Sequence, residues 1–382
     1  MYPTLSDLIA DLTGIYIPLP IYTFGFFMAL SFLVGAWLLH YHFTRLEGEG
    51  RLLPTHEKHI IGKPASVWGI VSNAIVGFIL GYKGAYALLH WTAFSQHPQD
   101  FLVNGTGSWV GGIVFALVLA ALHYYEKRKA QLPEPLEVEQ TIYPHERVGD
   151  IIVIAALTGI IGAKIFTWIE DIDSFLADPI GALLSFSGLT FYGGLIVAAL
   201  SLMWYARKKN IHIGHLVDSA ATVLILGYGI GRLGCHFSGD GDWGIVNTAP
   251  PPFAMPAWLW SYTYPHNVNR EGVPIPDCVG NYCMQLPEGV YPTSVYEFLM
   301  AFCIFLFLFF LTKRLRTPGL VFAVYLILNG LERFSIEFVR HNDLYNVLGV
   351  MLSQAQIIAI GLMTIGTILL VVLLQRRKTA VQ

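Results

Sequence analysis

Nine apolar stretches of membrane-spanning length restrict the fold of this 382-residue chain more than any other feature. A helix needs about 20 apolar residues to cross a hydrocarbon core of about 30 Å. The stretches lie at about 19–42, 67–90, 108–124, 149–169, 189–205, 214–233, 295–311, 318–338 and 354–374. Hydrophobic residues make up 54% of the chain and charged residues only 13%, which excludes an ordinary soluble domain. We expect an all-α polytopic integral membrane helix bundle of about nine transmembrane helices with a small extracytoplasmic cap.

The loops between these stretches differ sharply in basic charge. Those after the first, third, fifth, seventh and ninth stretches hold 17 of the 23 Lys and Arg residues. The opposite side holds only Arg232, Arg270 and Arg340, and Lys83, Lys164 and Arg333 lie within stretches. Basic residues favour the cytoplasmic side, so we expect a multi-pass protein of the cell (inner, cytoplasmic) membrane with its N-terminus outside and its C-terminus in the cytoplasm. Residues 1–18 carry no basic residue. We therefore expect the first stretch to be a permanent helix and not a cleaved signal peptide.

A two-helix unit is repeated in the first half of the chain. Each copy has a Lys after a run of small residues and a Gly-Gly pair further on, at Lys83 and Gly111-Gly112 and again at Lys164 and Gly193-Gly194. We expect a single transmembrane domain over residues 1–382, in which residues 50–145 are an inserted duplicate helix pair. Small residues at helical spacing also serve helix packing, so the repeat alone does not decide function.

Polar residues of five stretches gather at one membrane depth, on the predicted outer side. Arg333, Glu337 and Arg340 have the spacing i, i+4 and i+7 of one helical face. The other polar or glycine positions at this depth are Lys164, Tyr192, Gly193, Gly194, Arg232, Tyr296 and Glu297, with Asp240 and Asp242 just beyond the sixth stretch. Ionisable groups inside a membrane are costly and either line polar cavities or pair with one another. Because arginine suits phosphate, the pattern predicts a shared chamber for an anionic ligand.

Simpler explanations stay open for some of these residues. Arg333 and Glu337 can form a purely structural bridge one helical turn apart. Arg340, at the end of its stretch, can extend to lipid headgroups. The Gly-Gly pair at 193–194 is explained equally well by helix packing or by close approach of a lipid.

The segment 235–293 is the one long piece between stretches, and we expect it to form the extracytoplasmic cap. Cys278 and Cys283 both lie in it, so a local disulfide suits the oxidising side of the membrane. Cys235 and Cys303 are expected to be unpaired. The sequence has no Cys/His spacing typical of zinc and no phosphate-binding glycine loop for a nucleotide.

Four motifs resemble those of the prolipoprotein diacylglyceryl transferase family. The most specific is Gly231-Arg232-Leu-Gly234-Cys235-His-Phe-Ser-Gly239-Asp240-Gly-Asp242-Trp-Gly244, which is similar to the family's Gly-Arg-x-Gly signature. The others, in the family's order, are Phe191-Tyr192-Gly193-Gly194-Leu195, Pro292-Thr-Ser-Val-Tyr296-Glu297 and Arg333-x-x-x-Glu337-x-x-Arg340. The resemblance covers about residues 145–345 and the first stretch. The chain departs from the seven-span family by its extra pair at 50–145, by Tyr192 in place of a common His, and by Cys235 in place of a common Asn.

The resemblance implies an enzyme that moves the sn-1,2-diacylglyceryl group of phosphatidylglycerol to the lipobox cysteine thiol of a prolipoprotein. A thioether forms and glycerol phosphate leaves. The implied partners are phosphatidylglycerol, membrane lipid and prolipoprotein signal peptides with a lipobox cysteine, without nucleic acid, metal or another cofactor. Arg333, Glu337 and Tyr192 would be catalytic, with Tyr192 either relaying the thiol proton or binding the headgroup. Substrate would be bound by Arg232, as the main phosphate contact, and by Arg340, Gly193, Gly194, Asp240, Tyr296, Glu297 and Lys164.

Two other classes of protein remain as alternatives. A lipid or small-solute transporter with an outward-facing anion site would account for the repeat and the intramembrane charges. However, the polar residues cluster at one face, and no relay of basic and acidic residues reaches the cytoplasmic half. A structural assembly subunit would leave the charged face of the eighth stretch unexplained.

Overall fold

The computed structural model describes residues 1–96, 105–179, 181, 190–278, 280–340, 342–347 and 349–381. The α-helices are α1 (Leu5–Thr13), α2 (Thr23–Gly48), α3 (Val67–Leu89), α4 (Trp91–Gln96), α6 (Trp109–Lys129), α7 (Val148–Glu170), α8 (Ile172–Ala177), α10 (Phe191–Lys208), α11 (Ile213–Ser238), α12 (Ala257–Trp260), α13 (Thr293–Arg314), α14 (Leu320–Ile336) and α15 (Gln354–Val381). The 3-10 turns are η1 (Pro144–Arg147) and η2 (Glu337–Val339). Three antiparallel ribbons pair β1 (Thr55–Ile61) with β2 (Leu136–Ile142), β3 (Val273–Pro274) with β4 (Met284–Gln285), and β5 (Leu344–Val347) with β6 (Val350–Ser353).

Seven helices of the described residues are long and apolar enough to cross a membrane: α2, α3, α6, α7 with η1, α11, α13 and α15. The predicted all-α polytopic membrane bundle is therefore confirmed. Helices are expected here because a segment inside lipid must satisfy its backbone hydrogen bonds within itself. The two other predicted stretches also form helices, α10 and α14. Since α14 has only 17 residues and rises about 26 Å at 1.5 Å per residue, the count of nine spans stays a prediction.

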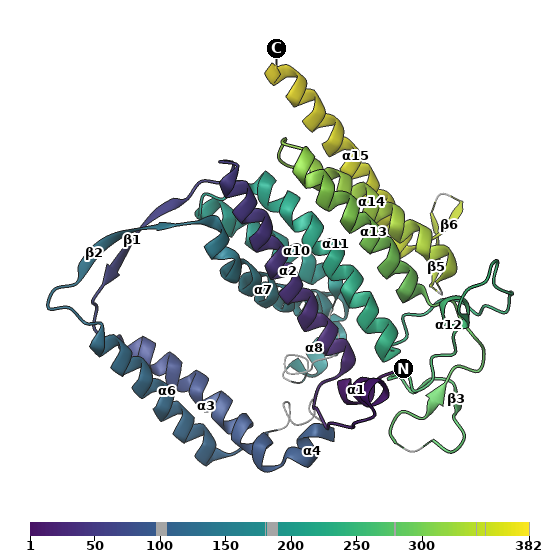
Figure 1. The fold of residues 1–382 in the computed structure, drawn as a ribbon, viewed down its shortest axis with the longest axis horizontal. Helices are drawn as coiled ribbons and strands as arrows, with labels where there is room; N and C mark the ends of the chain where they lie inside the picture. The colour runs from purple at the N-terminus through teal and green to yellow at the C-terminus, as the bar shows by residue number, and fades with distance from the viewer. Residues whose placement is uncertain are drawn as a thin grey trace.

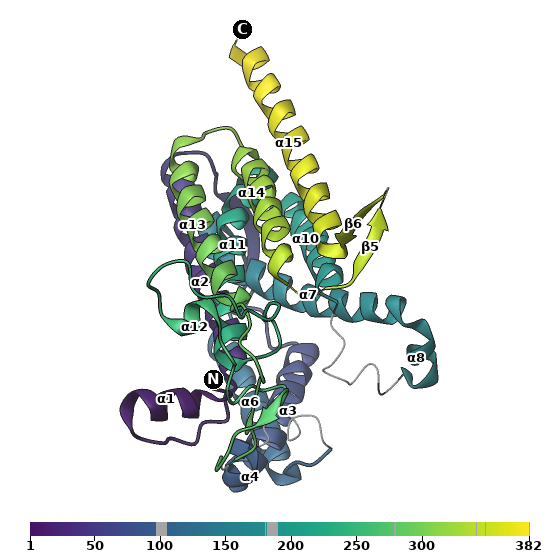
Figure 2. The same cartoon turned by 90° about the vertical axis from the view of Figure 1, so that its right-hand side faces the viewer.

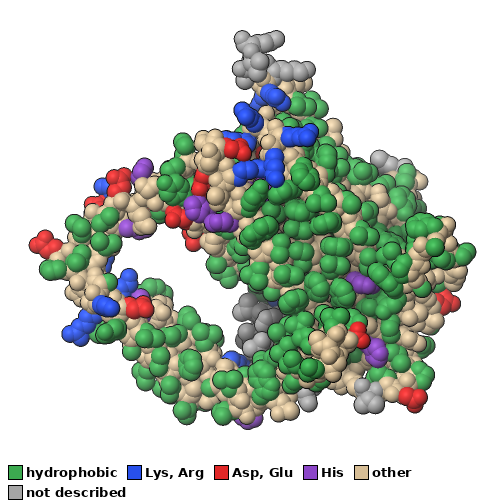
Figure 3. All heavy atoms as spheres, in the orientation of Figure 1, with side chains coloured by type: hydrophobic (Ala, Val, Ile, Leu, Met, Phe, Trp, Pro, Cys, Tyr) green, Lys and Arg blue, Asp and Glu red, His purple; other side chains and the backbone are tan. Residues whose placement is uncertain are grey.

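The helices form two bodies (Figure 1). The main bundle consists of α2, α7, α10, α11, α13, α14 and α15, in which α2 and α13 pack on α11, α7 packs on α10, and α14 packs on α15. The second body is the pair α3 and α6, which pack on each other and are joined to the bundle by the β1–β2 ribbon. Figure 3 shows an opening between the two bodies.

The β1–β2 ribbon makes the chain leave the bundle and return to it at one place. Its register runs from Thr55 opposite Ile142 to Ile61 opposite Leu136. At the base of the ribbon, the Glu57 carboxylate accepts hydrogen bonds from Arg147 at 2.7 Å and from Lys209 at 2.9 Å. This arrangement supports our proposal that residues 50–145 are an insertion.

The two repeated helix pairs pack through corresponding glycines. A Cβ atom on Gly81 would meet the carbonyl oxygen of Gly111, and a Cβ atom on Gly162 would meet that of Gly193. The residue before the second helix of each pair also donates its backbone N–H to a carbonyl oxygen of the first helix. Ser108 donates to Tyr82 in one pair, and Thr190 donates to Ala163 in the other. These equivalent contacts support the proposed duplication.

The central helix α11 sets the position of α14. The buried Asp218 of α11 accepts hydrogen bonds from the backbone N–H groups of Gly319 and Phe322, both at 2.8 Å. These are amides that the first turn of a helix leaves without partners of its own. Asp218 therefore caps α14 from a neighbouring helix and locks the two helices in register.

The two ends of the main bundle differ in chemistry. Lys and Arg side chains gather at the end that carries the C-terminus, and a broad apolar surface lies next to them (Figure 3). The opposite end carries α1, α12 and the β3–β4 ribbon, as Figures 1 and 2 both show. We call the segment 239–292 at this second end the cap segment. It contains a small core of Tyr264, Leu286 and Val290.

Candidate functional site

One buried carboxylate, at Glu297 near the start of α13, binds three guanidinium groups. Glu297 is 0% exposed. Arg333 of α14 donates to its Oε1 at 3.0 Å, and Arg340 donates to the same atom at 3.3 Å. Arg232 of α11 places Nε 3.4 Å from Oε2, and the Tyr228 hydroxyl donates to Oε1 at 2.9 Å. The three arginines that the sequence placed at one membrane depth therefore meet around one side chain.

A second carboxylate, Asp242, bridges two of the same arginines. Arg232 pairs with its Oδ2, and Arg340 donates to its Oδ1 at 2.7 Å. Burial by itself would raise the pKa of Asp242, but the two guanidinium groups outweigh it and hold that pKa below its ordinary value. We call Arg232, Asp242, Glu297, Arg333 and Arg340 the arginine cluster.

The loop after α11 is shaped so that Asp242 faces the cluster. Gly239 ends α11 with a φ of 66°, a left-handed conformation that favours glycine. The hydroxyls of Thr293 and Ser294 then donate to the carbonyl oxygen of Asp242, at 2.9 and 2.8 Å. A Cβ atom on Gly244 would meet the carbonyl oxygen of Val339, so the loop lies directly on η2, the turn that follows α14. The glycines of the signature therefore serve the close approach of three segments.

The end of α14 differs from the predicted continuous helix. The helix ends at Ile336 and η2 follows, so that Arg340 has an extended backbone with φ −95° and ψ 153°. Its placement at a helical i+7 position is therefore wrong, and so is extension of its side chain to lipid headgroups. Arg340 reaches the cluster because its strand-like backbone pairs with Gly244 in an isolated bridge.

Glu337 lies at the edge of the cluster. Its Oε2 is 3.6 Å from Nη2 of Arg333, one helical turn away, and its Oε1 accepts a hydrogen bond from Asn342. The predicted i,i+4 pair is therefore present, but Glu297 is the nearer partner of Arg333. A role for Glu337 in orienting Arg333 stays a proposal.

The other predicted site residues lie outside these ion pairs. Gly193 and Gly194 are buried against α7, where a Cβ atom would meet Phe166 and the carbonyl oxygen of Gly159 respectively, so helix packing accounts for both. The Tyr296 hydroxyl donates to the carbonyl oxygen of Leu259 at 2.7 Å and ties the cap segment to α13. The remaining two residues are on the neighbouring pair of helices, with Lys164 on α7 and Tyr192, 39% exposed, in the first turn of α10. Their roles in the site stay predictions.

Two residues of the site were not predicted. Tyr228 lies one turn before Arg232 on α11, and the guanidinium carbon of Arg232 is 5.1 Å from the centre of its ring. Glu332 of α14 is 3% exposed, and its Oε1 lies 3.4 Å from the Tyr228 hydroxyl. The sequence did hold a signal for both, because Tyr228 is spaced for contact with Arg232 and Glu332 is a charged residue inside an apolar stretch.

Cys235 and Asp240 border the cluster on the side of the N-terminal segment. The Cys235 Sγ and carboxylate oxygens of Asp240 and Asp242 lie within 4.8 Å of one another. Since both Asp242 oxygens already bind guanidinium groups, this trio does not present three free ligands to a metal ion. Burial raises the pKa of Asp240 above its ordinary value. The pKa shifts of the two aspartates therefore have opposite directions.

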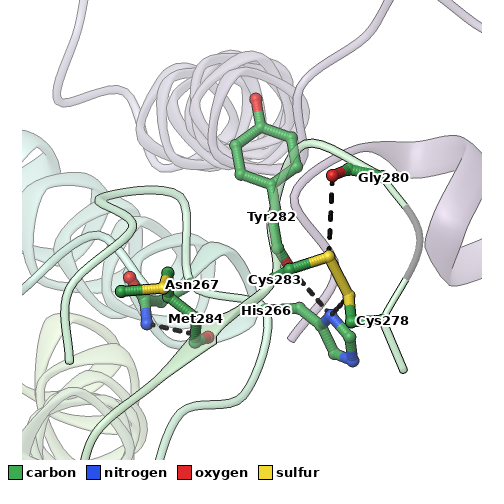
Figure 4. Close-up of a disulfide and its surroundings, with 7 residues drawn as sticks. All are labelled: His266, Asn267, Cys278, Gly280, Tyr282, Cys283 and Met284. Atoms are coloured by element: carbon green, nitrogen blue, oxygen red, sulfur yellow. Dashed lines mark hydrogen bonds between the residues drawn. A yellow bond between two sulfur atoms is a disulfide. The ribbon is translucent and has the colours of Figure 1, made fainter. Parts of the chain in front are cut away.

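The predicted disulfide is present, and it closes a loop of the cap segment. Cys278 and Cys283 are bonded, and Cys235 and Cys303 are free thiols. Figure 4 shows His266 beside this loop, where its Nδ1 lies 2.8 Å from the carbonyl oxygen of Tyr282. These contacts hold Tyr282 in place.

A cavity of about 620 Å³ adjoins Asp240. It is lined by Pro3, Pro20, Ile21, Tyr22, Phe24, Gly25, Ser238, Asp240, Val268 and Tyr282. Its walls therefore come from the residues that precede α2 together with the start of α2, from the end of α11, and from the cap segment.

The cluster is suited to an anion with several oxygens. Each guanidinium carries five N–H donors in a fixed plane, and the carboxylates of the cluster accept only some of them. The side chains of Arg232, Arg333 and Arg340 stay 12–24% exposed, so a phosphodiester can accept hydrogen bonds from their remaining donors without separating the arginines from their partners. Donors held in this way need no reorganisation when negative charge develops on a bound group.

Comparison with known proteins identifies the family. The sequence profile described as "Prolipoprotein diacylglyceryl transferase" matches residues 112–372. A relative from Dehalococcoides mccartyi is 32% identical over 228 residues, which are 59% of this chain and 76% of the relative. Others from Aeromonas hydrophila (27% over 290 residues, 74% and 90%) and Vibrio cholerae (28% over 233 residues, 60% and 76%) are similar. All three are named phosphatidylglycerol–prolipoprotein diacylglyceryl transferase. This chain, with its cluster built from the motifs at 231–244, 292–297 and 333–340, belongs to the prolipoprotein diacylglyceryl transferase family.

Proposed function

We propose that this protein transfers the sn-1,2-diacylglyceryl group of phosphatidylglycerol to the lipobox cysteine thiol of prolipoproteins. The reaction forms a thioether and releases glycerol phosphate. The proposal rests on membership of the transferase family and on one structural observation, the convergence of Arg232, Arg333 and Arg340 on the buried Glu297. Three guanidinium groups at one point suit a phosphodiester headgroup.

The bond changes balance without an oxidant or a metal. The thiol loses its proton, and the sulfur lone pair forms a bond to the glyceryl carbon that carries the phosphate. The bond from that carbon to oxygen breaks, and its electron pair leaves with glycerol phosphate. Because the leaving phosphate gains negative charge, guanidinium groups that face it stabilise the transition state.

The arginines have distinct positions in this proposal. Arg232 binds the phosphate from α11, and Arg333 binds it from α14, oriented by Glu297 and Glu337. Glu297, which the sequence assigned to substrate binding, is itself negative and acts by holding the guanidinium groups together. Tyr192 keeps its two possible roles, as a proton relay or as a headgroup ligand.

The distribution of charge and the disulfide support an outward-facing site. The basic loops predict that the end with α1 and the cap segment faces outward from the inner membrane, with the C-terminus in the cytoplasm. The Cys278–Cys283 disulfide suits that oxidising side. We therefore propose that transfer takes place at the outer leaflet, where precursors emerge from the membrane.

A direct test uses the purified protein in vesicles of phosphatidylglycerol with a labelled diacylglyceryl group. A peptide with a lipobox cysteine is added, and the product is analysed by mass spectrometry. The expected product is a thioether-linked diacylglyceryl peptide, formed together with an equal amount of glycerol phosphate. Movement of labelled lipid between leaflets without any thioether would contradict the proposal and indicate a transporter, which membership of the family does not favour.

A further inference from the structure

The cavity beside Asp240 differs in charge from the arginine cluster. None of the described residues that line it is Lys or Arg, and the one carboxylate among them is that of Asp240. A phosphodiester placed there would face this carboxylate, with no Lys or Arg side chain among the described lining residues, which is unfavourable in a partly buried site. The cavity is therefore suited to a neutral ligand, in contrast to the cluster next to it.

The cavity adjoins the arginine cluster at the loop after α11. The backbone N–H of Asp242 lies 3.4 Å from Oδ1 of Asp240, which lines the cavity. A carboxylate oxygen of Asp242 lies within 4.8 Å of one of Asp240, and the Asp242 carboxylate binds Arg232 and Arg340. A group that touches Asp240 from the cavity is therefore next to whatever the arginines bind.

The walls suit an extended peptide. The cavity has the volume of a typical ligand site, roughly 300–1,000 Å³, and it opens beside the first turn of α2. Tyr22, Phe24 and Val268 supply apolar and aromatic surface for side chains. A membrane-anchored precursor can reach this position because the start of a spanning helix lies at the level of the headgroups.

Tyr282 forms an aromatic wall of the cavity and belongs to the cap segment. The Cys278–Cys283 disulfide closes the loop that ends beside it, and the backbone of Tyr282 binds His266. In Figure 4 the Tyr282 ring points away from the sulfur atoms and toward a helix of the N-terminal part of the chain. Tyr282 therefore lines the cavity from the cap side, together with Tyr22 and Phe24 from the segment at the start of α2.

We propose that this cavity is the subsite for the cysteine-bearing peptide and that Asp240 accepts the proton of its thiol. The inference rests on the proposed transferase function and adds to it a place for the second substrate. The S–H bond breaks toward a carboxylate oxygen of Asp240. The sulfur then attacks the glyceryl carbon, and the electron pair of the broken carbon–oxygen bond leaves with the phosphate held by the arginines.

The environment of Asp240 supports this role. The groups facing it are Cys235 and Arg232 of α11, the carboxylate and backbone of Asp242, and the hydroxyl of Tyr264 from the cap segment. Burial dominates and raises its pKa above the ordinary value. A carboxylate with a raised pKa is a stronger base toward a thiol than an exposed one.

A binding experiment tests the subsite without turnover. A lipobox peptide with Ser in place of Cys and a photoreactive group beside it is irradiated with the full-length protein in phosphatidylglycerol vesicles. Cross-links are expected within residues 20–25 and 268–282. Cross-links that lie only elsewhere, or labelling of these residues by a photoreactive phosphatidylglycerol in place of the peptide, would overturn the proposal. If the peptide cross-links here and the wild type forms no thioether, the subsite stands and the proposed function fails.

Kinetic measurements distinguish the role of Asp240 as a base from the role of Tyr282 in peptide binding. Asp240→Asn is expected to lower kcat by about 10²-fold and to remove the rise in rate with pH that a titrating base gives. Tyr282→Ala is expected to raise the KM for the peptide by about tenfold and to leave the KM for phosphatidylglycerol unchanged. Phe253→Ala is the matched control, because Phe253 is an aromatic residue of the cap segment, 67% exposed, that does not line the cavity. A wild-type kcat and pH profile in Asp240→Asn, or an unchanged KM for the peptide in Tyr282→Ala, would contradict the inference. The proposed transferase function would still stand, because the wild-type protein would continue to form thioether.

Discussion

Arg333 donates to Glu297 at 3.0 Å, although 36 positions of sequence separate the two residues. The contact joins α14 to α13. It is shorter than the 3.6 Å contact between Arg333 and Glu337, which lies one helical turn further along the chain. Because Glu297 also binds Arg232 and Arg340, one side chain determines where three guanidinium groups meet.

Removal of the Glu297 carboxylate should destabilise the protein strongly. In Glu297→Ala, three guanidinium groups lose a buried counter-charge, and loss of one partner of a buried pair costs roughly 3–5 kcal/mol. We expect a large drop in the thermal unfolding temperature of the purified protein and loss of transfer. Glu49→Gln is the control, because its pair with Arg51 at 3.0 Å is far more exposed and such pairs contribute about 0–1 kcal/mol. Equal unfolding temperatures for both variants would show that Glu297 does not hold the cluster.

The contact of α7 with α10 should not tolerate a side chain at Gly193. A Cβ atom there would meet Phe166 and the carbonyl oxygen of Gly162, so Gly193→Ala must separate the helices. Overpacking of this kind costs about 1–3 kcal/mol, measured as a fall in unfolding temperature. The matched control is Gly227→Ala on α11, where the added atom would meet only Ser31 at 3.9 Å and where Ala favours the helix. A stable Gly193→Ala protein with wild-type transfer would reject the packing role.

The two aspartates of the signature loop should respond oppositely to substitution. The pKa of Asp240 is raised, so its contribution to stability is complete below its ordinary pKa of 3.8 and is lost as the pH rises through the raised value. The pKa of Asp242 is lowered, so its contribution is present above 3.8 and is lost as the pH falls through the lowered value.

At neutral pH, Asp240→Asn should therefore raise the unfolding temperature and Asp242→Asn should lower it. Acidification toward about pH 4 should shrink the first difference and preserve the second, because only the pKa of Asp240 lies above its ordinary value. Unfolding followed by tryptophan fluorescence over this pH range measures both. Destabilisation by both variants at neutral pH would contradict the opposite shifts.

The proposed insertion should be dispensable for folding of the main bundle. His59 and Val138 face each other in the β1–β2 ribbon, so an Asn-Gly turn can join them and replace residues 60–137. This deletion keeps Glu57 and its bonds to Arg147 and Lys209 at the base of the ribbon. We expect a protein that inserts into the membrane and forms thioether in the same assay. A protein that fails to insert, although the ribbon base is retained, would show that α3 and α6 belong to the structural core.

The sequence predicted which residues would share one end of the bundle. An apolar stretch reverses the direction of the chain, so counting the stretches assigned Arg232, Glu297 and Arg333 to one side before any contact was known. Asp240 and Asp242 were assigned to the same side because they come just beyond the sixth stretch. Topology alone was therefore sufficient to place these residues at the same end of the bundle.

The choice of partners could not be predicted in the same way. Glu297 is the nearer partner of Arg333 than Glu337 because the rotation of α14 is set by contacts between helices, such as the cap that Asp218 provides. Arg340 does not lie on the predicted helical face, because α14 ends at Ile336. A sequence pattern does not fix the last residues of a helix, since helix ends vary by one or two residues. The cavity beside Asp240 was also missed, since its walls come from three segments far apart in sequence.

The most direct test of the arginine cluster is the rate of thioether formation in Arg232→Ala and Arg333→Ala, measured with labelled phosphatidylglycerol and a lipobox peptide. Arg51→Ala is the control, because its side chain is 17% exposed, as is that of Arg232, and it pairs with a glutamate at the other end of the bundle. We predict a loss of about 10²–10³-fold in rate for each cluster variant, with wild-type insertion and a wild-type rate for Arg51→Ala. Rates near wild type in both cluster variants would contradict the account.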